Sequence, residues 1–441
     1  MLCLPLIYHA NNADLFQSIR HWPYPLWLDS CHDQGTQGRY DILTAQPENY
    51  FSSSIAPDNL TEIINKHLLI HYKVYFSHQA ELDSAIPMPG LFGYLSYEAN
   101  HSAEKIDVHK DKNITLPILF LGFYPWCIVV DHQQQKTWLA SLLNQDITQE
   151  IFKQITNANI SSQLDHEIPF CITEQYQSNL TQNEYFSAFH KIQNYLYQGD
   201  CYQVNFAQRF QASYQGDPFI AYQRNRKVMP APYSAFLQLP EGCILCHSPE
   251  HFIRVNDQCV ETSPIKGTAA KQMNEQADQL AQQQLLDSEK NHAENLMIVD
   301  LLRNDLGKVC EIGSVQVETL CELKTFSHVH HLISTITGKL ARNISPLDLL
   351  QACFPGGSIT GAPKHRAMEI INELEPHRRS IYCGSMIHLG INHRLDSNIM
   401  IRTQVTHEGK IYAWAGGGIV ADSQAEEEYE ESFVKVRPLL I

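Results

Sequence analysis

The chain has 441 residues, of which 44% are hydrophobic, and its formal net charge is −16. A chain of this length can bury a sizeable core and allows roughly two to four domains. The charge argues against a nucleic-acid binder and a partner of anionic membranes, and a small anionic substrate would need local cations or a metal ion. The twelve cysteines lack a complete set of metal-ligand spacings, so we expect reduced thiols and a cytoplasmic location.

The first part of the chain predicts strands. Apolar stretches at residues 91–97 and 118–130 are interrupted by Gly or Pro, which favours buried strands over a membrane span. Residues 1–6 are apolar but lack a basic leader, and we expect no signal peptide. Residues 157–182 are rich in Asn, Gln, Ser and Thr. Such a polar stretch predicts a connection, and we place a boundary near residue 175.

The second part of the chain mixes helices with strands. Residues 185–197 and 293–306 have helical spacing and precede Gly199 and Gly307, respectively. Residues 399–405 and 410–415 flank His407-Glu408-Gly409, which is the pattern of a hairpin. Strands joined by hairpins, with helices elsewhere, predict an α+β fold and not a doubly wound sheet.

Lys266 lies between Pro264-Ile265 and Gly267-Thr268. Pro and Gly restrict this stretch, and we expect a short loop after a strand. A lysine can act as a nucleophile when burial leaves part of its population neutral. An ordinary lysine is a solvated surface cation, so the role of Lys266 depends on its neighbours.

Oxygen-bearing side chains follow helical spacing in two places. Glu428 and Glu431 lie three residues apart, and Asn291 and Glu294 repeat this spacing near the start of another expected helix. Residues at this spacing share a helix face, so two helices could present oxygen ligands to one hard cation, magnesium and not zinc. The alternative is that the acidic run at residues 426–431 is only a solvated helix face.

Two glycine-rich segments could approach a ligand closely. Residues 356–364 resemble a phosphate loop, but Lys364 does not directly follow the last Gly, so this is no Walker motif. Its backbone N–H groups could still receive a carboxylate. Gly416, Gly417 and Gly418 come directly after the last expected strand, where the alternative is a bulge or a sharp turn.

Arg402 and a histidine cluster are further candidates. We expect Arg402 on the strand that enters the hairpin, from which its guanidinium could bind a carboxylate at two points. Among residues 327–331, His328 and His331 share a face if the segment is helical, whereas His330 and His331 point oppositely if it is extended. A lone histidine is more often structural, and His331 is the candidate that we retain.

These segments occur in a characteristic order. They are Pro264-Ile265-Lys266-Gly267-Thr268, Ala293-Glu294-Asn295-Leu296-Met297-Ile298-Val299-Asp300-Leu301, Arg303-Asn304-Asp305, Gly361-Ala362-Pro363-Lys364 and Gly416-Gly417-Gly418-Ile419. Together they resemble the chorismate-utilizing enzymes, most strongly over residues 180–436. Phe92-Gly93-Tyr94-Leu95-Ser96-Tyr97-Glu98 resembles the N-terminal part of the anthranilate synthase large subunits and aminodeoxychorismate synthases.

The resemblance implies a fold and a division of the chain. It implies two intertwined subdomains with large antiparallel sheets packed as a sandwich and helices on the outside. The expected division is an N-terminal region over residues 1–175, like that of anthranilate synthase component I, and a chorismate-binding catalytic region over residues 176–441.

Two positions distinguish the reactions within this family. Aminodeoxychorismate synthases resemble this chain in having a lysine at the place of Lys266, whereas anthranilate synthases have alanine. Isochorismate and salicylate synthases use a lysine base where this chain has Gln203, and an amide cannot take a proton from water at neutral pH. The resemblance thus implies amination of chorismate to 4-amino-4-deoxychorismate, for para-aminobenzoate and folate biosynthesis. The alternatives are anthranilate synthase component I and a catalytically silent, partner-binding relative.

The resemblance also implies roles for individual residues. Lys266 would form a covalent adduct with the substrate, and Glu250 would protonate the leaving hydroxyl, which requires a raised pKa. Magnesium would be held by Glu294, Glu428, Glu431 and Asn291, the last of which stands where relatives carry an acid. The substrate would contact His331, Thr360, Tyr382, Arg402, Gly416, Gly417, Gly418 and Lys435.

Two further binding partners are implied. The chain has no recognisable glutaminase nucleophile loop, so ammonia would come from glutamine through a separate glutamine amidotransferase subunit in a heterodimer. Some relatives hold tryptophan between the N-terminal sheet and the core. The matching residues here are Ser30, Gln37, Gly38, Arg39, Tyr40, Pro232, Tyr233 and Ser234.

Overall fold

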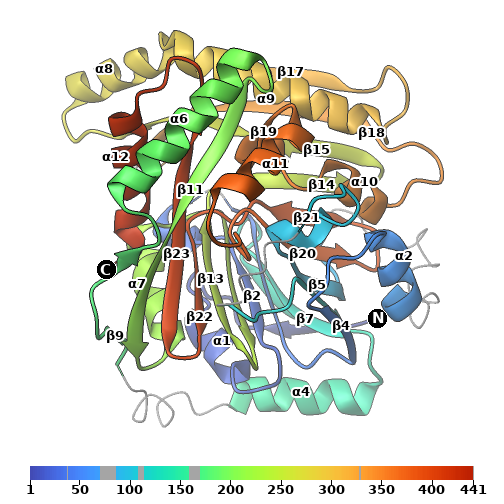
Figure 1. Ribbon diagram of the computed structural model, residues 1–441. Coiled ribbons are helices and arrows are strands. Elements are labelled where there is room, and N and C mark those ends of the chain that lie inside the picture. The colour runs from blue at the N-terminus through green and yellow to red at the C-terminus, as the bar shows by residue number, and fades with distance from the viewer. Residues whose placement is uncertain (37, 70–85, 108–113, 158–168, 327–328, 441) are drawn as a thin grey trace.

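The fold consists of two large antiparallel sheets that pack face to face, with helices around them (Figure 1). The computed structural model describes residues 1–36, 38–69, 86–107, 114–157, 169–326 and 329–440. The predicted α+β class is confirmed. Among these described residues, no helix combines the length and the apolar composition that a membrane span requires.

The first sheet has thirteen strands within the described residues. Its main path runs through β1 (Leu2–Leu6), β8 (Lys136–Ser141), β7 (Trp126–Asp131), β3 (Tyr40–Thr44), β2 (Leu26–Asp29), β12 (Tyr233–Leu239), β13 (Gly242–Ser248), β22 (Thr403–His407), β23 (Lys410–Ile419), β11 (Gln203–Gln215) and β10 (Gln177–Ser178). The strands β9 (Cys171–Ile172) and β19 (Gly361–Ala362) also pair with β11. Because β2 pairs with β12, the early and late parts of the chain share one sheet.

The second sheet has ten strands within the same described ranges. Its path runs through β16 (Ile265–Ala270), β18 (Val329–Lys339), β15 (Cys259–Ser263), β14 (His251–Asn256), β21 (Leu395–Asn398), β20 (Ser385–Gly390), β5 (Gly90–Leu95), β6 (Leu119–Tyr124) and β4 (Asn49–Ser53). The strand β17 (Gln316–Thr325) pairs with β18. The pairing of β5 with β20 joins the early and late parts a second time. The division at residue 175 therefore stays a prediction.

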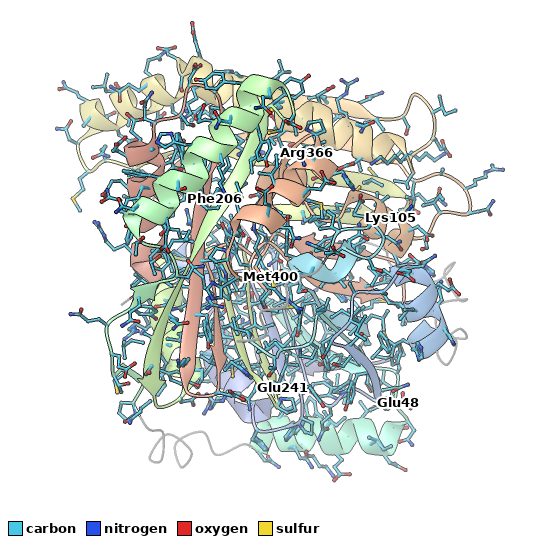
Figure 2. All side chains as sticks on the ribbon, in the orientation of Figure 1. Glu48, Lys105, Phe206, Glu241, Arg366 and Met400 are labelled. Carbon is cyan, nitrogen blue, oxygen red and sulfur yellow. The ribbon has the colours of Figure 1, made fainter. Side chains whose placement is uncertain are left out.

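The main core fills the space between the sheets. In β12, Ala235 and Leu237 belong to this core, whereas Phe236 packs on the opposite face with Trp27 and Phe219. This alternation follows from the two-residue period of a strand. Figure 2 shows how densely side chains fill the interior. The first sheet is therefore buried on both faces around β12.

Helices cover the outer faces and edges of the sheets (Figure 1). They are α1 (Ala13–Ile19), α2 (Leu60–Ile64), α4 (Gln145–Asn157), α6 (Gln182–Gln198), α7 (Pro218–Val228), α8 (Glu275–Leu286), α9 (Glu289–Gly307), α10 (Pro346–Cys353), α11 (Lys364–Leu374) and α12 (Ala425–Val436). Short helical turns are η1 (His32–Gln34), η2 (Asn65–Leu69), η4 (Tyr97–Asn100), η6 (Gly357–Ile359) and η7 (Arg437–Leu439). The helix expected at residues 185–197 is confirmed as α6, which ends at Gly199 with a φ of 81°.

Three local expectations are wrong. Residues 399–402 are irregular and β22 begins only at Thr403, so Arg402 lies before the strand with a φ of 50°. Lys266 lies within strand β16 and not in a loop, and the strand register shifts between Ile265 and Thr268. Thus Lys266 stands at a bulge, where a strand commonly re-aims a side chain.

The third correction concerns the glycine triplet. Gly416, Gly417 and Gly418 form neither a bulge nor a turn after the strand but continue β23, paired with β11. A Cβ on Gly416 would stand 2.1 Å from the carbonyl oxygen of Phe206. Glycine is therefore required there because the two backbones approach so closely.

Candidate active site

Most of the predicted site residues line one cavity of about 760 Å³. Strands β16, β18 and β23 and helices α9 and α12 all contribute to its wall. The predicted residues that it brings together are Lys266, Glu250, Asn291, Glu294, His331, Tyr382, Arg402, Gly416, Gly418, Glu428, Glu431 and Lys435. A cavity of this size, with converging polar groups, can enclose a small anionic molecule.

The amine of Lys266 is largely buried at this wall. Its side chain is 15% exposed, and Nζ lies 3.8 Å from Oε2 of Glu294. Burial lowers the pKa of Lys266, although the negative charge of Glu294 acts in the opposite direction. The amine is therefore neutral more often than that of a surface lysine, as a nucleophile requires.

Glu250 lies in the turn between β13 and β14. Its backbone N–H donates to Oγ of Ser248 at 3.1 Å, and its carboxyl Oε1 accepts a hydrogen bond from Oγ of Ser358 at 2.6 Å. Burial raises the pKa of Glu250 to about 7, even though the Ser358 hydrogen bond and the Lys266 charge lower it. Glu250 can therefore hold a proton near neutral pH, which is what a general acid needs.

The oxygen-bearing side chains project from two helices. Asn291 and Glu294 lie on α9, and Glu428 and Glu431 lie on α12. In the described part of the chain, no three His, Cys, Asp or Glu side chains form a ready-made metal centre. Lysines stand beside the carboxylates instead: Lys290 faces Glu428 at 3.8 Å, for example.

The electrostatics of these carboxylates fit a hard cation. Burial and the neighbouring charge of Glu431 raise the pKa of Glu428, against a hydrogen bond from Ser423. Burial would also raise the pKa of Glu431. The ammonium group of Lys435, at 2.5 Å, nevertheless holds the pKa of Glu431 below its usual value. Two close carboxylates and nearby amide and carboxylate oxygens are the donor chemistry that magnesium prefers.

Arg402 offers a cation to the same cavity. Within the described residues its guanidinium makes no hydrogen bond or ion pair, and burial lowers the pKa of Arg402. Burial and the Arg402 charge together lower the pKa of His331 to about 4, so His331 is neutral at pH 7. Its Nδ1 pairs with the Thr268 hydroxyl at 2.8 Å. Arg402 is thus available for an anion.

Two predicted contact residues lie outside the cavity wall. Thr360 is fully buried, and its hydroxyl donates to the carbonyl of Gly356 at 3.0 Å. Gly417 packs against α12 instead, and a Cβ at that position would stand 2.6 Å from Oε2 of Glu428. Gly417 thus makes room for a proposed metal ligand. His328 and Gln37 lie outside the described residues.

Ser358, Lys290 and Trp414 are among the residues of the cavity wall that were not predicted. Ser358 stands in the glycine-rich segment, for which only backbone N–H groups were considered. Lys290 directly precedes Asn291, so the sequence could have predicted its position at the same end of the helix. Trp414 stacks on Tyr382 with the ring planes 3° apart, a contact that nothing in the local sequence indicates.

A second cavity of about 830 Å³ contains the residues matched to the tryptophan site of relatives. Those described are Ser30, Gly38, Arg39, Tyr40, Pro232, Tyr233 and Ser234. The two cavities adjoin, because Pro232, Pro249, Ile265 and Phe326 line both of them. The two sets of predicted residues therefore lie at two neighbouring cavities.

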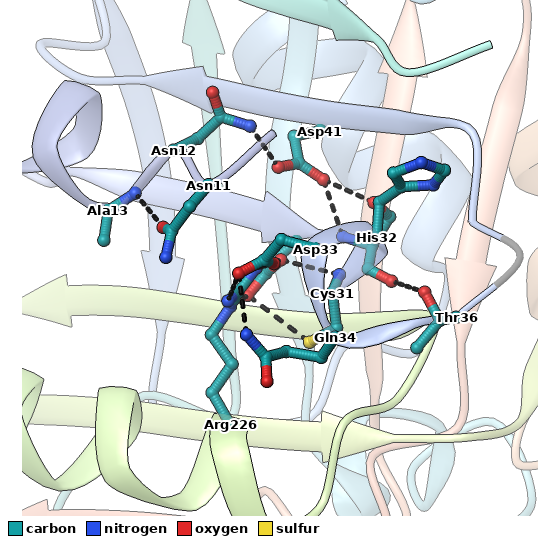
Figure 3. Close-up of polar contacts among 12 residues, drawn as sticks. Asn11, Asn12, Ala13, Cys31, His32, Asp33, Gln34, Thr36, Asp41 and Arg226 are labelled. Atoms are coloured by element: carbon teal, nitrogen blue, oxygen red, sulfur yellow. Dashed lines mark hydrogen bonds and ion pairs between the residues drawn. The ribbon is translucent and has the colours of Figure 1, made fainter. Parts of the chain in front are cut away.

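Asp29 and Ser30 line the second cavity and belong to a network of buried ion pairs and hydrogen bonds, whose polar contacts Figure 3 shows. The guanidinium of Arg226 donates to both carboxylate oxygens of Asp29, at 2.6 and 3.0 Å, and also pairs with Asp33. The carboxylate of Asp41 accepts from the backbone N–H and the hydroxyl of Ser30. These bonds fix the wall in one arrangement.

Known proteins resemble the chain over nearly its whole length. The family model described as chorismate binding enzyme matches residues 25–441. The chain is 41% identical over 434 residues to aminodeoxychorismate synthase component 1 of Salmonella typhimurium, covering 96% of this chain and 94% of that protein. It is 40% identical over 450 residues to the protein of the same name from Escherichia coli, covering 99% and 97%.

A solved structure agrees with this likeness. Anthranilate synthase component I from Streptococcus pneumoniae TIGR4 superposes with a TM-score of 0.78 at 27% identity, covering 92% of this chain and 93% of that one. The sandwich of antiparallel sheets thus agrees with the sequence likeness. The chain belongs to the chorismate binding enzyme family.

Proposed function

We propose that this chain is the chorismate-aminating component of an aminodeoxychorismate synthase, which makes 4-amino-4-deoxychorismate for para-aminobenzoate and folate biosynthesis. The observation that carries the proposal is that Lys266, with a lowered pKa, and Glu250, with a pKa raised to about 7, line the same cavity. A neutral amine can attack, and a protonated carboxyl can donate. Relatives at about 40% identity carry the corresponding name.

In the first step, Lys266 is the nucleophile. Its Nζ forms a bond to carbon 2 of the chorismate ring, the two ring double bonds shift from C1=C2 and C5=C6 to C1=C6 and C4=C5, and the bond between carbon 4 and its hydroxyl oxygen breaks. Hydroxide is a poor leaving group, so Glu250 transfers its proton to that oxygen and water departs. Glu250 is left as a carboxylate and Lys266 as a secondary ammonium.

In the second step, ammonia replaces the lysine. Its nitrogen forms a bond to carbon 4, the two double bonds shift back to C5=C6 and C1=C2, and the bond between carbon 2 and Nζ breaks. One proton of the new ammonium group passes to the Glu250 carboxylate, which restores the acid and the free amine of Lys266. The net reaction exchanges a hydroxyl for an amine at carbon 4 and releases water.

Groups in the cavity wall would bind the two carboxylates of chorismate. Arg402 binds one carboxylate with its guanidinium, which has no hydrogen-bond or ion-pair partner in the part of the chain that the structure describes. We assign Glu294, Glu428 and Glu431, with the Asn291 amide oxygen, as the residues that hold magnesium. When bound, that ion supplies positive charge for the ring carboxylate. Lys435 donates to the carbonyl of Gly416 at 2.9 Å and so supports the strand beneath the substrate.

The proposal includes a partner that supplies ammonia. The name component 1 of the relatives implies a second component, and we propose that it is a glutamine amidotransferase that hydrolyses glutamine. We propose that the pair works in the cytoplasm. Concentrated ammonium salts should replace the partner in a test of the isolated chain, because ammonia itself is the nucleophile.

Product analysis tests the reaction. The purified chain is incubated with chorismate, magnesium and ammonium, and the products are separated and identified by mass. The expected product carries an amine at carbon 4 and retains the enolpyruvyl group. Anthranilate with free pyruvate would support an anthranilate synthase instead. No product, together with no rise in melting temperature on adding chorismate and magnesium, would support a silent relative.

A second experiment tests the covalent step alone. The chain is mixed with chorismate and magnesium in the absence of ammonia, quenched in acid and weighed intact. We expect an added mass of chorismate less one water in the wild type and none in Lys266→Ala. A wild type that aminates chorismate without ever showing the adduct would remove Lys266 from the role of nucleophile.

For the second cavity, we infer that tryptophan is the ligand. The supporting observation is that the residues matched to the tryptophan site of relatives line one cavity. Equilibrium dialysis with labelled tryptophan tests the inference, with phenylalanine as the competitor of smaller size. Failure of tryptophan to bind would remove this ligand but leave the amination proposal standing.

A further inference from the structure

We propose that Ser358 is a positioning residue that orients the acid Glu250, by donating a hydrogen bond to Oε1 so that the proton for the leaving group stands on Oε2. This inference rests on the proposed function of the site. It concerns one bond between two residues that both line the active-site cavity and lie 108 positions apart in the chain.

The chemistry of a protonated carboxyl makes this bond selective. Such a carboxyl has one oxygen that only accepts and one that carries the proton. Oγ of Ser358 lies 2.6 Å from Oε1 of Glu250 and donates to it. Oε1 is therefore the accepting oxygen, and Oε2 is the oxygen that can give its proton to the substrate. No other side chain in the described residues makes a hydrogen bond to this carboxyl.

Tight packing holds Ser358 in place. It lies in η6, and the glycines before it fit against neighbouring side chains: a Cβ on Gly356 would stand 2.7 Å from Cδ1 of Ile399. A Cβ on Gly357 would stand 2.5 Å from Cδ2 of Leu301. The donor is therefore fixed by packing on two sides.

The far end of η6 and the backbone of Glu250 are also held. Arg379 donates to the carbonyl of Ile359 at 2.8 Å. Oγ of Ser248 accepts from the Glu250 N–H and donates to the carbonyl of Ile399 at 2.5 Å. Because both partners are held in place, the hydrogen bond fixes the orientation of the carboxyl.

Few charged groups compete with Ser358 for this carboxyl. Lys266 on β16 acts on Glu250 through its charge, and the Cys383 thiol before β20 faces it from another side. Burial raises the pKa of Cys383 to about 12, so this thiol is uncharged. His251, the next residue, is buried with a lowered pKa and is neutral. Removing the Ser358 hydroxyl should therefore raise the pKa of Glu250.

The kinetic test uses Ser358→Ala with Ser358→Thr as the conservative variant. In the wild type, activity should fall as the pH rises through about 7, because Glu250 loses its proton. In Ser358→Ala we expect kcat to fall about tenfold and the alkaline limb to move upward by about one pH unit, the effect of one lost hydrogen bond. KM for chorismate should stay within about twofold, because the bond serves the acid and not substrate binding. Ser358→Thr should recover most of kcat.

A matched control separates this role from a general effect of losing a serine. Oγ of Ser213 donates to a carboxylate oxygen of Glu174, also at 2.6 Å, on the surface. Ser213→Ala should leave both kcat and the pH profile unchanged. A loss of activity in Ser358→Ala without any movement of the alkaline limb would overturn the proposal and leave Ser358 a structural role.

A direct titration keeps this test independent of the proposed function. The carboxyl of Glu250 is followed by ¹³C NMR in protein labelled at glutamate, and Glu250→Gln identifies its signal. The pKa should be higher in Ser358→Ala than in the wild type, whether or not the chain aminates chorismate. An unchanged pKa would overturn the hydrogen-bond assignment, whereas a wild type without amination activity would overturn the proposed function alone.

Discussion

The two cavities share part of a wall, but their charged side chains differ in pairing and in pKa. In the second cavity the arginines are paired, for example Arg39 with Asp131 and Arg394 with Asp396, each at 2.8 Å. In the active-site cavity Arg402 has no such partner among the described residues, and the pKa values of Lys266 and Glu250 are shifted toward their neutral forms. A guanidinium without such a partner and pKa values shifted toward the neutral forms are typical of a site built for chemistry.

Removing the Lys266 amine should have the largest effect on the amination rate and leave the second cavity unaffected. Lys266→Ala should lower the amination rate by on the order of ten-thousandfold or more, since alanine carries no nucleophile at that position. Quenched-flow product analysis measures the rate. Tryptophan binding to the second cavity should persist in the variant. A variant that retains a tenth of the activity would show that Lys266 only binds substrate.

The second largest loss of activity should follow when Glu250 cannot donate a proton. Glu250→Gln keeps the shape but cannot donate a proton, so kcat should fall roughly a hundredfold to ten-thousandfold. Below about pH 7 the wild-type carboxyl is protonated and active, and above it the activity should decline. The residual rate of Glu250→Gln should show no such alkaline decline. The measurement is kcat from pH 6 to 9 with saturating ammonia.

A smaller effect should follow from the space that Gly417 leaves for Glu428. In Gly417→Ala the new Cβ would stand 2.6 Å from Oε2 of Glu428 and displace that carboxylate. We expect the magnesium concentration for half-maximal activity to rise roughly tenfold to a hundredfold. Gly307→Ala is the control, because nothing lies within 4 Å of a Cβ there. Equal magnesium dependence in both variants would argue against the assigned metal site.

The smallest effect on activity should come from the second cavity. Tyr233 lines only that cavity and stacks on His251 with ring centroids 5.2 Å apart. At a hundred times its Kd, tryptophan should stabilise the wild type by about 2.7 kcal/mol and raise Tm by a few degrees. Tyr233→Ala should lose this shift while kcat stays within about twofold. A large loss of kcat would show that the two cavities do not act separately.

Much of the site could be predicted because the identities of reactive residues are local information. Glycine after a helix, carboxylates three residues apart and the segment around Lys266 are visible in the chain, and the helices α6, α9 and α12 follow from them. The resemblance of the sequence motifs also predicted the antiparallel sandwich and the family. Twelve of the fourteen residues assigned to catalysis, metal and substrate line one cavity, and their roles stay predictions.

Tertiary structure alone decided how those residues meet. Pairing with β11 makes Gly416–Gly418 part of a continuous strand, for which a bulge or turn had been the alternative. A φ of 50° at Arg402 places this residue before the strand on which it was expected. The hydroxyl of Ser358 reaches Glu250 across 108 positions of sequence. The raised pKa of Glu250 arises from burial by distant segments. The sequence by itself determined which chemical groups were available and which local elements carry them. Long-range pairing and burial, which depend on the whole chain, decided their contacts and their protonation.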